Sequence, residues 1–218
     1  MGEWLIPADC KSAASGYAGS NPALSTKGKF MRSFKDNNLN NFIAGWYIDT
    51  DLCDLIVTRS ENNLTEFSAG VKECTDCYLQ TFNKQMHTQY CEQLVQVIEE
   101  YKKLYPYCYK DMHVWGWTPP RIQRYDPNKA YRDIHCENNG LGIYRNRHLA
   151  YMTYLNDVKV GGGTEFVQQQ LTTPAETGLT LIWPAGWTHH HRGVVAPVET
   201  KYIITGWLCF FPDNKAQE

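Results

Sequence analysis

The chain has 218 residues, enough for one barrel-sized domain with flanking helices or, at the limit, two small domains. Its net charge is −2 and no basic patch stands out, which argues against a nucleic-acid partner held by electrostatics. No apolar run approaches the length of a membrane span, and no N-terminal segment has the order of a secretory signal. We therefore expect a cytoplasmic protein with no membrane segment.

The first thirty residues are rich in Ala, Ser and Gly and have little periodicity. Residues 1–30 are therefore predicted to form a weakly structured tail. Met31 would serve equally well as a translation start, so the tail is interpreted as an upstream extension or an artefact. The intact mass of natively expressed protein would test this interpretation.

Helical and strand patterns alternate up to residue 106. Residues 41–49 read as a strand, after which Asp49 is a candidate N-cap for a helix ending near Asn62. The apolar face of that helix would consist of Leu52, Leu55, Ile56 and Val57. Residues 87–105 carry the clearest helical stripe in the chain, formed by Tyr90, Leu94, Val97, Ile98, Tyr101 and Leu104. Residues 70–83 fit a strand or a loop equally well.

Short strands with turn residues between them dominate the second half. After a break at residues 115–120, the predicted strands are 121–125, 131–136, 149–156, 164–166, 179–183 and 201–211. The turns fall at residues 126–128, 138–140, 161–163 and 184–186. Many short strands joined by Gly and Pro turns indicate a double-sheet jelly roll, so the predicted fold class is α+β, mainly β.

A potential metal site begins at His135 and Glu137. If residues 131–136 form a strand, side chains at i and i+2 share one face, so this imidazole and carboxylate point into the same volume. A second imidazole would complete the two-His, one-carboxylate set of non-haem Fe(II) oxygenases, which leaves coordination positions open. The consecutive histidines 189–191 offer it. Alternation places His189 and His191 on one face, and spacing alone does not choose between them.

Lys201 stands at the start of a segment, residues 200–211, that reads as a long buried strand. A lysine at this position either reaches solvent or pairs with an anion. Beside an iron site, we interpret Lys201 as the partner of a dicarboxylate co-substrate whose other end chelates the metal.

These motifs, in this order and spacing, resemble the catalytic domain of Fe(II)- and 2-oxoglutarate-dependent dioxygenases of the prolyl 4-hydroxylase type. The matching pieces are Arg124-Tyr125-Asp126-Pro127, His135-Cys136-Glu137, Tyr154 to Val158, Gly161 to Phe166, His191-Arg192-Gly193, Lys201-Tyr202 and Trp207. The similarity covers roughly the C-terminal half. Residues 41–107 resemble more loosely the helical support that precedes the barrel in this family, whose small stand-alone phage and bacterial members are the most similar.

The resemblance implies a single domain over residues 31–218, with helical support over about 41–110 and a jelly-roll core over about 118–212. It also selects His191 as the second imidazole, because the distal histidine of the family precedes the 2-oxoglutarate lysine by ten positions. The implied site has Fe(II) on His135, Glu137 and His191, and 2-oxoglutarate on Lys201, Tyr125 and Thr164, with Trp207 packed near Lys201. His189 would then lie behind the ligands.

Three features depart from the family pattern. The usual His-x-Asp is His-x-Glu here, so the carboxylate of Glu137 is one methylene longer. Tyr125 lies one residue further from His135 than in many relatives. The usual Gly-Gly-Glu-Thr is Gly-Gly-Gly-Thr, with the acid displaced to Glu165.

The implied reaction is hydroxylation of a C–H bond, in the first place of a peptidyl proline. It would use O2, convert 2-oxoglutarate to succinate and CO2, and use L-ascorbate as reductant. The alternatives are an oxygenase acting on a non-proline small molecule, a non-catalytic jelly-roll module that binds a metal or ligand, and a zinc-dependent hydrolase on a similar barrel.

Two further groups of residues invite a functional interpretation. Trp115, Trp117, Tyr144 and Trp187 either line the entrance to the site or pack near the barrel rim, and Arg145 and Arg147 either meet an acidic substrate or are solvated. The eight cysteines are expected to be thiols. Cys74 and Cys77 form a Cys-x-x-Cys pair, for which we prefer packing in a helix to a structural zinc site.

Overall fold

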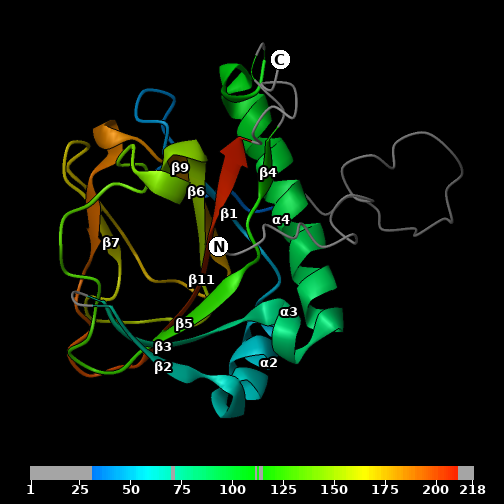
Figure 1. Ribbon diagram of the computed structural model, residues 1–218, viewed down its shortest axis with the longest axis vertical. Helices are drawn as coiled ribbons and strands as arrows, with labels where there is room; N and C mark the ends of the chain where they lie inside the picture. The colour runs from blue at the N-terminus through cyan, green and yellow to red at the C-terminus, as the bar shows by residue number, and fades with distance from the viewer. Residues whose placement is uncertain (1–30, 70–71, 111, 113–114, 211–218) are drawn as a thin grey trace, which may run out of the picture. The chain divides into compact units, whose positions relative to one another are not determined.

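The computed structural model describes residues 31–69, 72–110, 112 and 115–210, and in these ranges the chain forms two antiparallel β-sheets (Figure 1). The large sheet has the order β1 (Ala44–Tyr47), β9 (Leu179–Pro184), β6 (Arg147–Tyr154), β11 (Lys201–Phe210), β5 (Arg121–Tyr125), β3 (Lys72–Tyr78) and β2 (Thr65–Ala69), and β4 (Trp115–Trp117) pairs with β11. The small sheet has the order β10 (His191–Gly193), β7 (Thr164–Phe166) and β8 (Leu171–Thr173). This arrangement confirms the predicted class, mainly β with two antiparallel sheets. The tail predicted for residues 1–30 lies outside the described residues.

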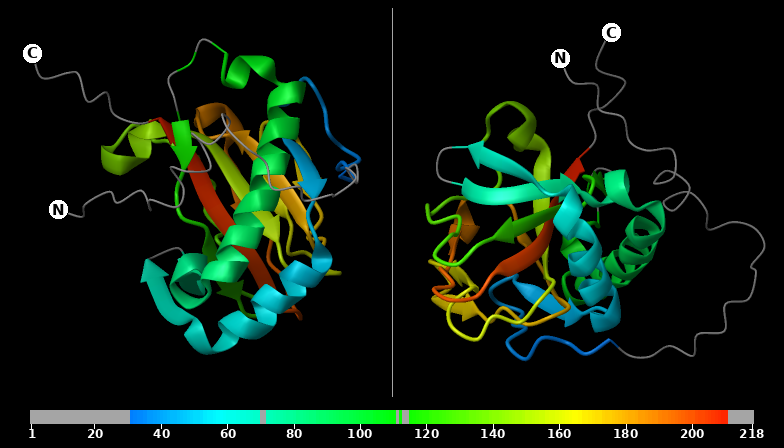
Figure 2. Two further views of the ribbon diagram at one scale, coloured as in Figure 1. Left: turned by 90° about the vertical axis from the view of Figure 1, so that its right-hand side faces the viewer. Right: turned by 90° about the horizontal axis from the view of Figure 1, so that it is seen from below.

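Helices α2 (Thr50–Ser60), α3 (Leu79–Phe82) and α4 (Lys84–Leu104) flank the large sheet on one side, and Figure 2 shows α4 crossing it in front of β11. The predicted cap of α2 is confirmed, because the Asp49 carboxylate accepts a hydrogen bond from the Asp51 amide at 2.9 Å. Along α4 the predicted stripe is buried from Tyr90 to Tyr101 and packs on the sheet. On α2 the expected face differs by one position, because Cys53 is buried and Leu55 is exposed.

Alternation along β11 separates the helix-covered face of the large sheet from its other face. Ile204 and Leu208 belong to the core under the helices, together with residues of α4. Lys201, Ile203 and Thr205 point the other way and line a cavity to which the small sheet also contributes. The functional residues of the two sheets therefore meet on the face away from the helices.

The segment 131–136 is predicted to be a strand, and this prediction is wrong, because no regular strand forms there. The chain there is irregular and touches β10 through an isolated bridge in which His135 and His191 exchange both backbone hydrogen bonds, at 3.0 and 2.9 Å. Arg132, Asp133 and Ile134 are exposed, so no buried face stabilises a continuous ladder. Residues 115–117, predicted to be a break, instead form β4.

The glycine turn ahead of β7 fixes where Thr164 enters the cavity. Gly161 has φ +72°, and a Cβ on Gly163 would lie 1.8 Å from the carbonyl oxygen of Thr173. Neither position therefore accepts a side chain, which explains the Gly-Gly-Gly sequence and the displacement of the acid to Glu165. Across the described residues, no helix has the length and apolar character needed to span a membrane.

The expected helical packing of Cys74 and Cys77 is wrong, because both lie on strand β3. Residues three apart on a strand point to opposite faces, and Cys74 belongs to the core on the cavity side while Cys77 packs on the helix side. This arrangement does not let the two thiols chelate one ion. No cysteine among the described residues forms a disulfide bond.

Candidate metal centre

His135, Glu137 and His191 come together at one end of the cavity, with one donor atom from each within 4.8 Å of the others. The Oε1 atom of Glu137 lies 3.7 Å from Nε2 of His135 and 3.4 Å from Nε2 of His191. Bonds of about 2.0–2.2 Å to a shared ion place neighbouring donors roughly 3–4 Å apart, so the spacing suits a single metal ion. The backbone bridge between residues 135 and 191 supplies this convergence in place of the expected strand face.

Both imidazoles are held in one tautomer by the same local device. Nδ1 of His135 contacts the carbonyl oxygen of Asp133 at 2.8 Å, and Nδ1 of His191 contacts that of His189 at 2.9 Å. A carbonyl can only accept, so Nδ1 carries a proton in each ring and Nε2 is the nitrogen left to bind a metal. Metal-binding histidines are oriented in this way by their outer hydrogen bonds.

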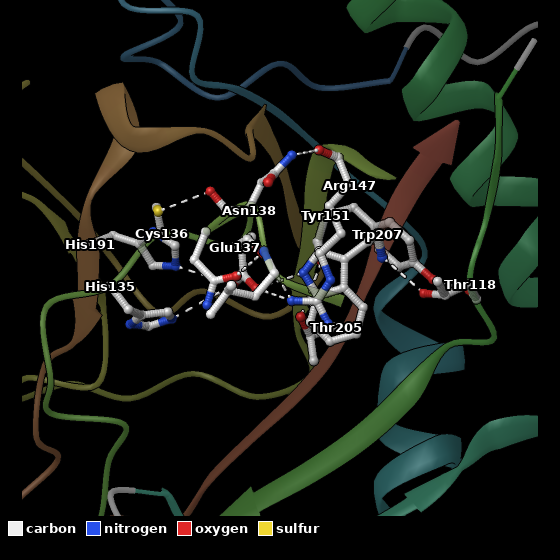
Figure 3. A network of polar contacts seen from close by, with 12 residues as sticks. Thr118, His135, Cys136, Glu137, Asn138, Arg147, Tyr151, His191, Thr205 and Trp207 are labelled. Carbon is white, nitrogen blue, oxygen red and sulfur yellow. Dashed lines mark hydrogen bonds and ion pairs between the residues drawn. The ribbon is translucent and has the colours of Figure 1, made fainter. Parts of the chain in front are cut away.

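The carboxylate of Glu137 divides its oxygens between two tasks (Figure 3). Oε1 faces the imidazoles, whereas Oε2 accepts hydrogen bonds from the Arg147 guanidinium at 3.0 Å and the Trp207 indole at 2.7 Å. Arg147 also stacks 3.5 Å above the ring of Trp207. The extra methylene of glutamate, compared with the usual aspartate, lets one carboxylate span the distance from the histidines to this Arg147–Trp207 pair.

The charge of Glu137 is fixed by these neighbours. Its side chain is 12% exposed, and burial alone would raise its pKa. The imidazoles of His135 and His191 outweigh burial and hold the pKa of Glu137 well below its usual range. With an ion in place of the Nε2 protons, the site would present one ionised carboxylate and two imidazole nitrogens, a donor set suited to Fe(II).

The cavity extends from these three residues to Lys201 and has a volume of about 440 Å³. Lys201 is 4% exposed, and no described carboxylate forms an ion pair with it. Burial lowers the pKa of Lys201 to about 8. A buried ammonium facing a cavity without a counter-charge is a receptor for an anion of suitable shape.

The other residues expected around a co-substrate also line this cavity, each with a partner of its own. The Tyr125 hydroxyl donates to Oε1 of Gln123 at 2.9 Å, and the Lys201 ammonium lies 5.1 Å from the Tyr125 ring centre. The Thr164 hydroxyl is hydrogen-bonded to the Tyr154 hydroxyl at 2.8 Å. Trp207 lies on the same face of β11 as Lys201, and its indole N–H is bonded to Glu137.

The two other histidines of the triplet face elsewhere. Nε2 of His189 contacts the carbonyl oxygen of Asn41 at 2.8 Å, so its buried ring ties the turn before β10 to the segment before β1. His189 supports the site through its backbone carbonyl, which orients His191. The His190 ring contacts the Trp187 carbonyl oxygen at 2.5 Å and does not reach the cluster.

Arg147 is the main residue that sequence reasoning misplaced. The sequence suggests that Arg147 is either solvated or faces an acidic substrate. Its guanidinium instead binds Glu137, ten residues earlier in the chain. A buried carboxylate needs a cationic partner, but periodicity does not show which arginine supplies it. Among the aromatic candidates for the entrance, Tyr144 lines the cavity, Trp117 packs on the helix-side core and Trp187 is exposed; the side chain of Trp115 lies outside the described set.

Replacing Arg147 with methionine is expected to lower the metal affinity about 10–100-fold, because Oε2 of Glu137 loses its charged partner and Oε1 its fixed orientation. Calorimetric titration with Mn²⁺, a stand-in for Fe²⁺ that O2 does not oxidise readily, measures this change. Arg145→Met is the matched control, because Arg145 is exposed in the preceding turn. Equal affinities in the two variants would show that Arg147 does not position the carboxylate.

Comparison with known proteins finds a family pattern over the part of the chain that carries this geometry. Residues 120–209 match the sequence pattern of the 2OG-Fe(II) oxygenase superfamily. No curated protein sequence matches the chain.

Solved structures of prolyl hydroxylases share the fold. The 2OG complex of the viral collagen prolyl hydroxylase from Paramecium Bursaria Chlorella virus-1 is 12% identical, covering 78% of this chain and 97% of that one, with a TM-score of 0.60. A Pseudomonas putida prolyl-4-hydroxylase is 13% identical, covering 79% and 94%, with a TM-score of 0.62. A Trichoplax adhaerens prolyl hydroxylase, in complex with a hypoxia inducible factor oxygen degradation domain peptide fragment, is 13% identical, covering 78% and 86%, with a TM-score of 0.60.

At 12–13% identity these structures show the shared fold, and they confirm the predicted jelly roll with N-terminal helices. The family match covers the candidate metal ligands and Lys201. Residues 120–209 therefore carry the sequence pattern of the 2OG-Fe(II) oxygenase superfamily, within a fold that the solved prolyl hydroxylases share.

Proposed function

We propose that this protein is an Fe(II)- and 2-oxoglutarate-dependent dioxygenase that hydroxylates a C–H bond, in the first place that of a prolyl residue in a peptide. One observation carries the proposal: a cluster of two imidazoles and one carboxylate shares a cavity with a buried lysine that has no described counter-ion. A simple metal-binding module has no need of the lysine, because burying an unpaired ammonium costs stability.

In this proposal, His135 and His191 hold the iron through Nε2 and Glu137 holds it through Oε1. Lys201 pairs with the far carboxylate of 2-oxoglutarate, and the wall between them includes Thr164. When bound, Fe(II) and 2-oxoglutarate supply, with O2, the oxidising power to hydroxylate an unactivated C–H bond, with release of succinate and CO2.

The protein's own contribution is orientation and exclusion of water. Trp183 of β9 packs edge-on against His191 at 5.1 Å and Phe166 of β7 packs at 5.5 Å, so apolar rings from both sheets back this ligand. On the opposite side, Arg147 and Trp207 hold Glu137. These contacts keep the donor atoms in place and limit access to the side of the ion that faces the cavity.

The choice of a peptidyl proline rests on the prolyl hydroxylases that share the fold, one of which was solved with a peptide fragment. In this chain, Tyr144 lies beside Arg147, with the guanidinium 4.5 Å from its ring centre, and both line the cavity near Glu137. The Tyr144 ring offers an apolar surface of the kind that packs against the pyrrolidine ring of proline.

The test is succinate formation from 2-oxoglutarate by the Fe²⁺-loaded protein with ascorbate and a panel of proline-containing peptides. We expect succinate together with a gain of one oxygen atom in the peptide, detected by mass. Succinate without peptide oxidation would redirect the search to small-molecule substrates. If the protein neither binds 2-oxoglutarate nor forms succinate, the proposal is wrong; activity restored by Zn²⁺ and not Fe²⁺ would indicate a hydrolase.

A further inference from the structure

Gln123 is a buried polar side chain on the cavity wall whose amide nitrogen has no hydrogen-bond partner among the described residues. The residue is 2% exposed and lies on β5 among the residues that line the cavity. Its Oε1 accepts the hydrogen bond from Tyr125, whereas no described residue accepts a hydrogen bond from Nε2. Leaving a buried amide N–H without an acceptor is destabilising, so such a group calls for a ligand or water that completes it.

The sheet register places this amide next to Lys201. On β5 and β11, Tyr125 is opposite Lys201 and Gln123 is opposite Ile203. Directly opposite residues share a face, and diagonal neighbours such as Gln123 and Lys201 lie about 7–8 Å apart at their backbones, within reach of long side chains. A carboxylate between them can therefore accept from the ammonium with one oxygen and from the amide with the other.

The remaining groups on this wall do not compete for the same anion. Asp76 is opposite Gln123 on β3, but its carboxylate pairs with Arg121 at 3.0 Å, which neutralises both. The Tyr125 hydroxyl is already committed as a donor to Gln123. The free N–H groups that remain close to Lys201 are therefore those of the Gln123 amide.

We propose that the Gln123 amide, rather than the Tyr125 hydroxyl, is the second hydrogen-bond donor to the distal carboxylate of 2-oxoglutarate, and that Tyr125 is a positioning residue that holds the amide in place. This inference rests on the proposed function and gives it a specific residue. It revises the role that the sequence resemblance implies for Tyr125, and it makes Gln123 a determinant of selectivity for dicarboxylic over monocarboxylic 2-oxo acids.

The test is calorimetric binding of two probes to the Mn²⁺-loaded protein: 2-oxoglutarate, and 2-oxopentanoate, which has the same chain length but no distal carboxylate. In Gln123→Leu, we expect the affinity for 2-oxoglutarate to fall about tenfold or more, the usual effect of losing a hydrogen bond to a charged group. The affinity for 2-oxopentanoate should stay within about twofold of the wild type, which a general structural disturbance would not allow. Tyr125→Phe should weaken 2-oxoglutarate binding less than Gln123→Leu.

Matched variants distinguish a failure of this inference from a failure of the proposed function. Gln89→Leu, an exposed glutamine on α4, is the control for the substitution itself; Gln123→Met replaces Gln123→Leu if the latter unfolds at a lower temperature than the wild type. Unchanged 2-oxoglutarate affinity in Gln123→Leu, or a larger loss in Tyr125→Phe, would overturn the inference while Lys201→Met still reports on the proposed function. If the wild type does not prefer 2-oxoglutarate to 2-oxopentanoate, the proposed function fails, and this inference fails with it.

Discussion

Lys201→Met is expected to abolish tight binding of 2-oxoglutarate and, at the same time, to stabilise the ligand-free protein. Removing one partner of a buried charge pair costs about 2–5 kcal/mol, a loss of roughly 30-fold to several thousandfold in affinity. The free energy of unfolding of the ligand-free protein should rise, because the wild-type ammonium is buried without a described counter-charge. A pKa lowered from 10.5 to about 8 corresponds to a penalty on the order of 3 kcal/mol at pH 7, which methionine removes.

The same pKa shift predicts two opposite pH dependences. Between about pH 8 and 10.5 the unfolded chain binds more protons at Lys201 than the folded one, so the wild-type free energy of unfolding rises with pH there and its deficit relative to Lys201→Met shrinks. Affinity for 2-oxoglutarate should be constant below about pH 8 and fall above it, because the neutral amine offers no charge.

Denaturant unfolding measures the free energy of unfolding and calorimetry measures the 2-oxoglutarate affinity, each at pH values about one unit apart between roughly pH 6 and 10. Lys159→Met is the control, because Lys159 is exposed, and it should change neither quantity. A Lys201→Met protein that is less stable than the wild type at pH 7 would mean that Lys201 is a structural residue with a protein partner, contrary to the geometry of the cavity.

His191→Ala is expected to lower metal affinity at least about 100-fold and to abolish hydroxylation. Loss of an outer hydrogen bond to a metal ligand typically costs 10–100-fold, and loss of the ligand itself should cost more. The neighbouring His190→Ala should keep the wild-type affinity, because its ring contacts the Trp187 carbonyl oxygen and does not reach the cluster. Two adjacent histidines thus provide a variant and its control within one loop.

Titration with Mn²⁺ and circular dichroism of both variants check this prediction. His189→Ala should behave differently from either, with reduced thermal stability and little change in metal affinity, because its ring holds Asn41 and only its backbone carbonyl orients His191. Equal losses of metal affinity in His190→Ala and His191→Ala would contradict the assignment of His191 as a ligand.

The elements that could be predicted are those whose residues carry a local signal. The α4 stripe from Tyr90 to Tyr101 and the strands over residues 121–125 and 164–166 were predicted with the correct type, since burial on one side imposes a period of 3.6 or 2. The segment 131–136 misled because its aromatic and β-branched residues suit a strand, whereas its exposed residues and its bridge to His191 keep it irregular. The conformation of this segment is set by its pairing with His191, a contact distant in the sequence that no local pattern can predict.

The site shows the same division between motif and context. His135, Glu137, His191 and Lys201 were chosen from spacing and from a family resemblance, and the structure brings all four to one cavity. Two neighbours of these residues in the cavity, Arg147 and Gln123, were missed because their positions follow from strand register and from the length of Glu137. Such positions become visible only when opposite strands are placed side by side.

A crystal structure of the protein grown with Mn²⁺ and 2-oxoglutarate would test the central claim most directly. The account predicts one ion bonded to Nε2 of His135, Nε2 of His191 and Oε1 of Glu137, and a 2-oxoglutarate molecule that reaches from this ion to the Lys201 ammonium. An ion bound away from these three side chains, or 2-oxoglutarate that leaves Lys201 uncontacted, would contradict it.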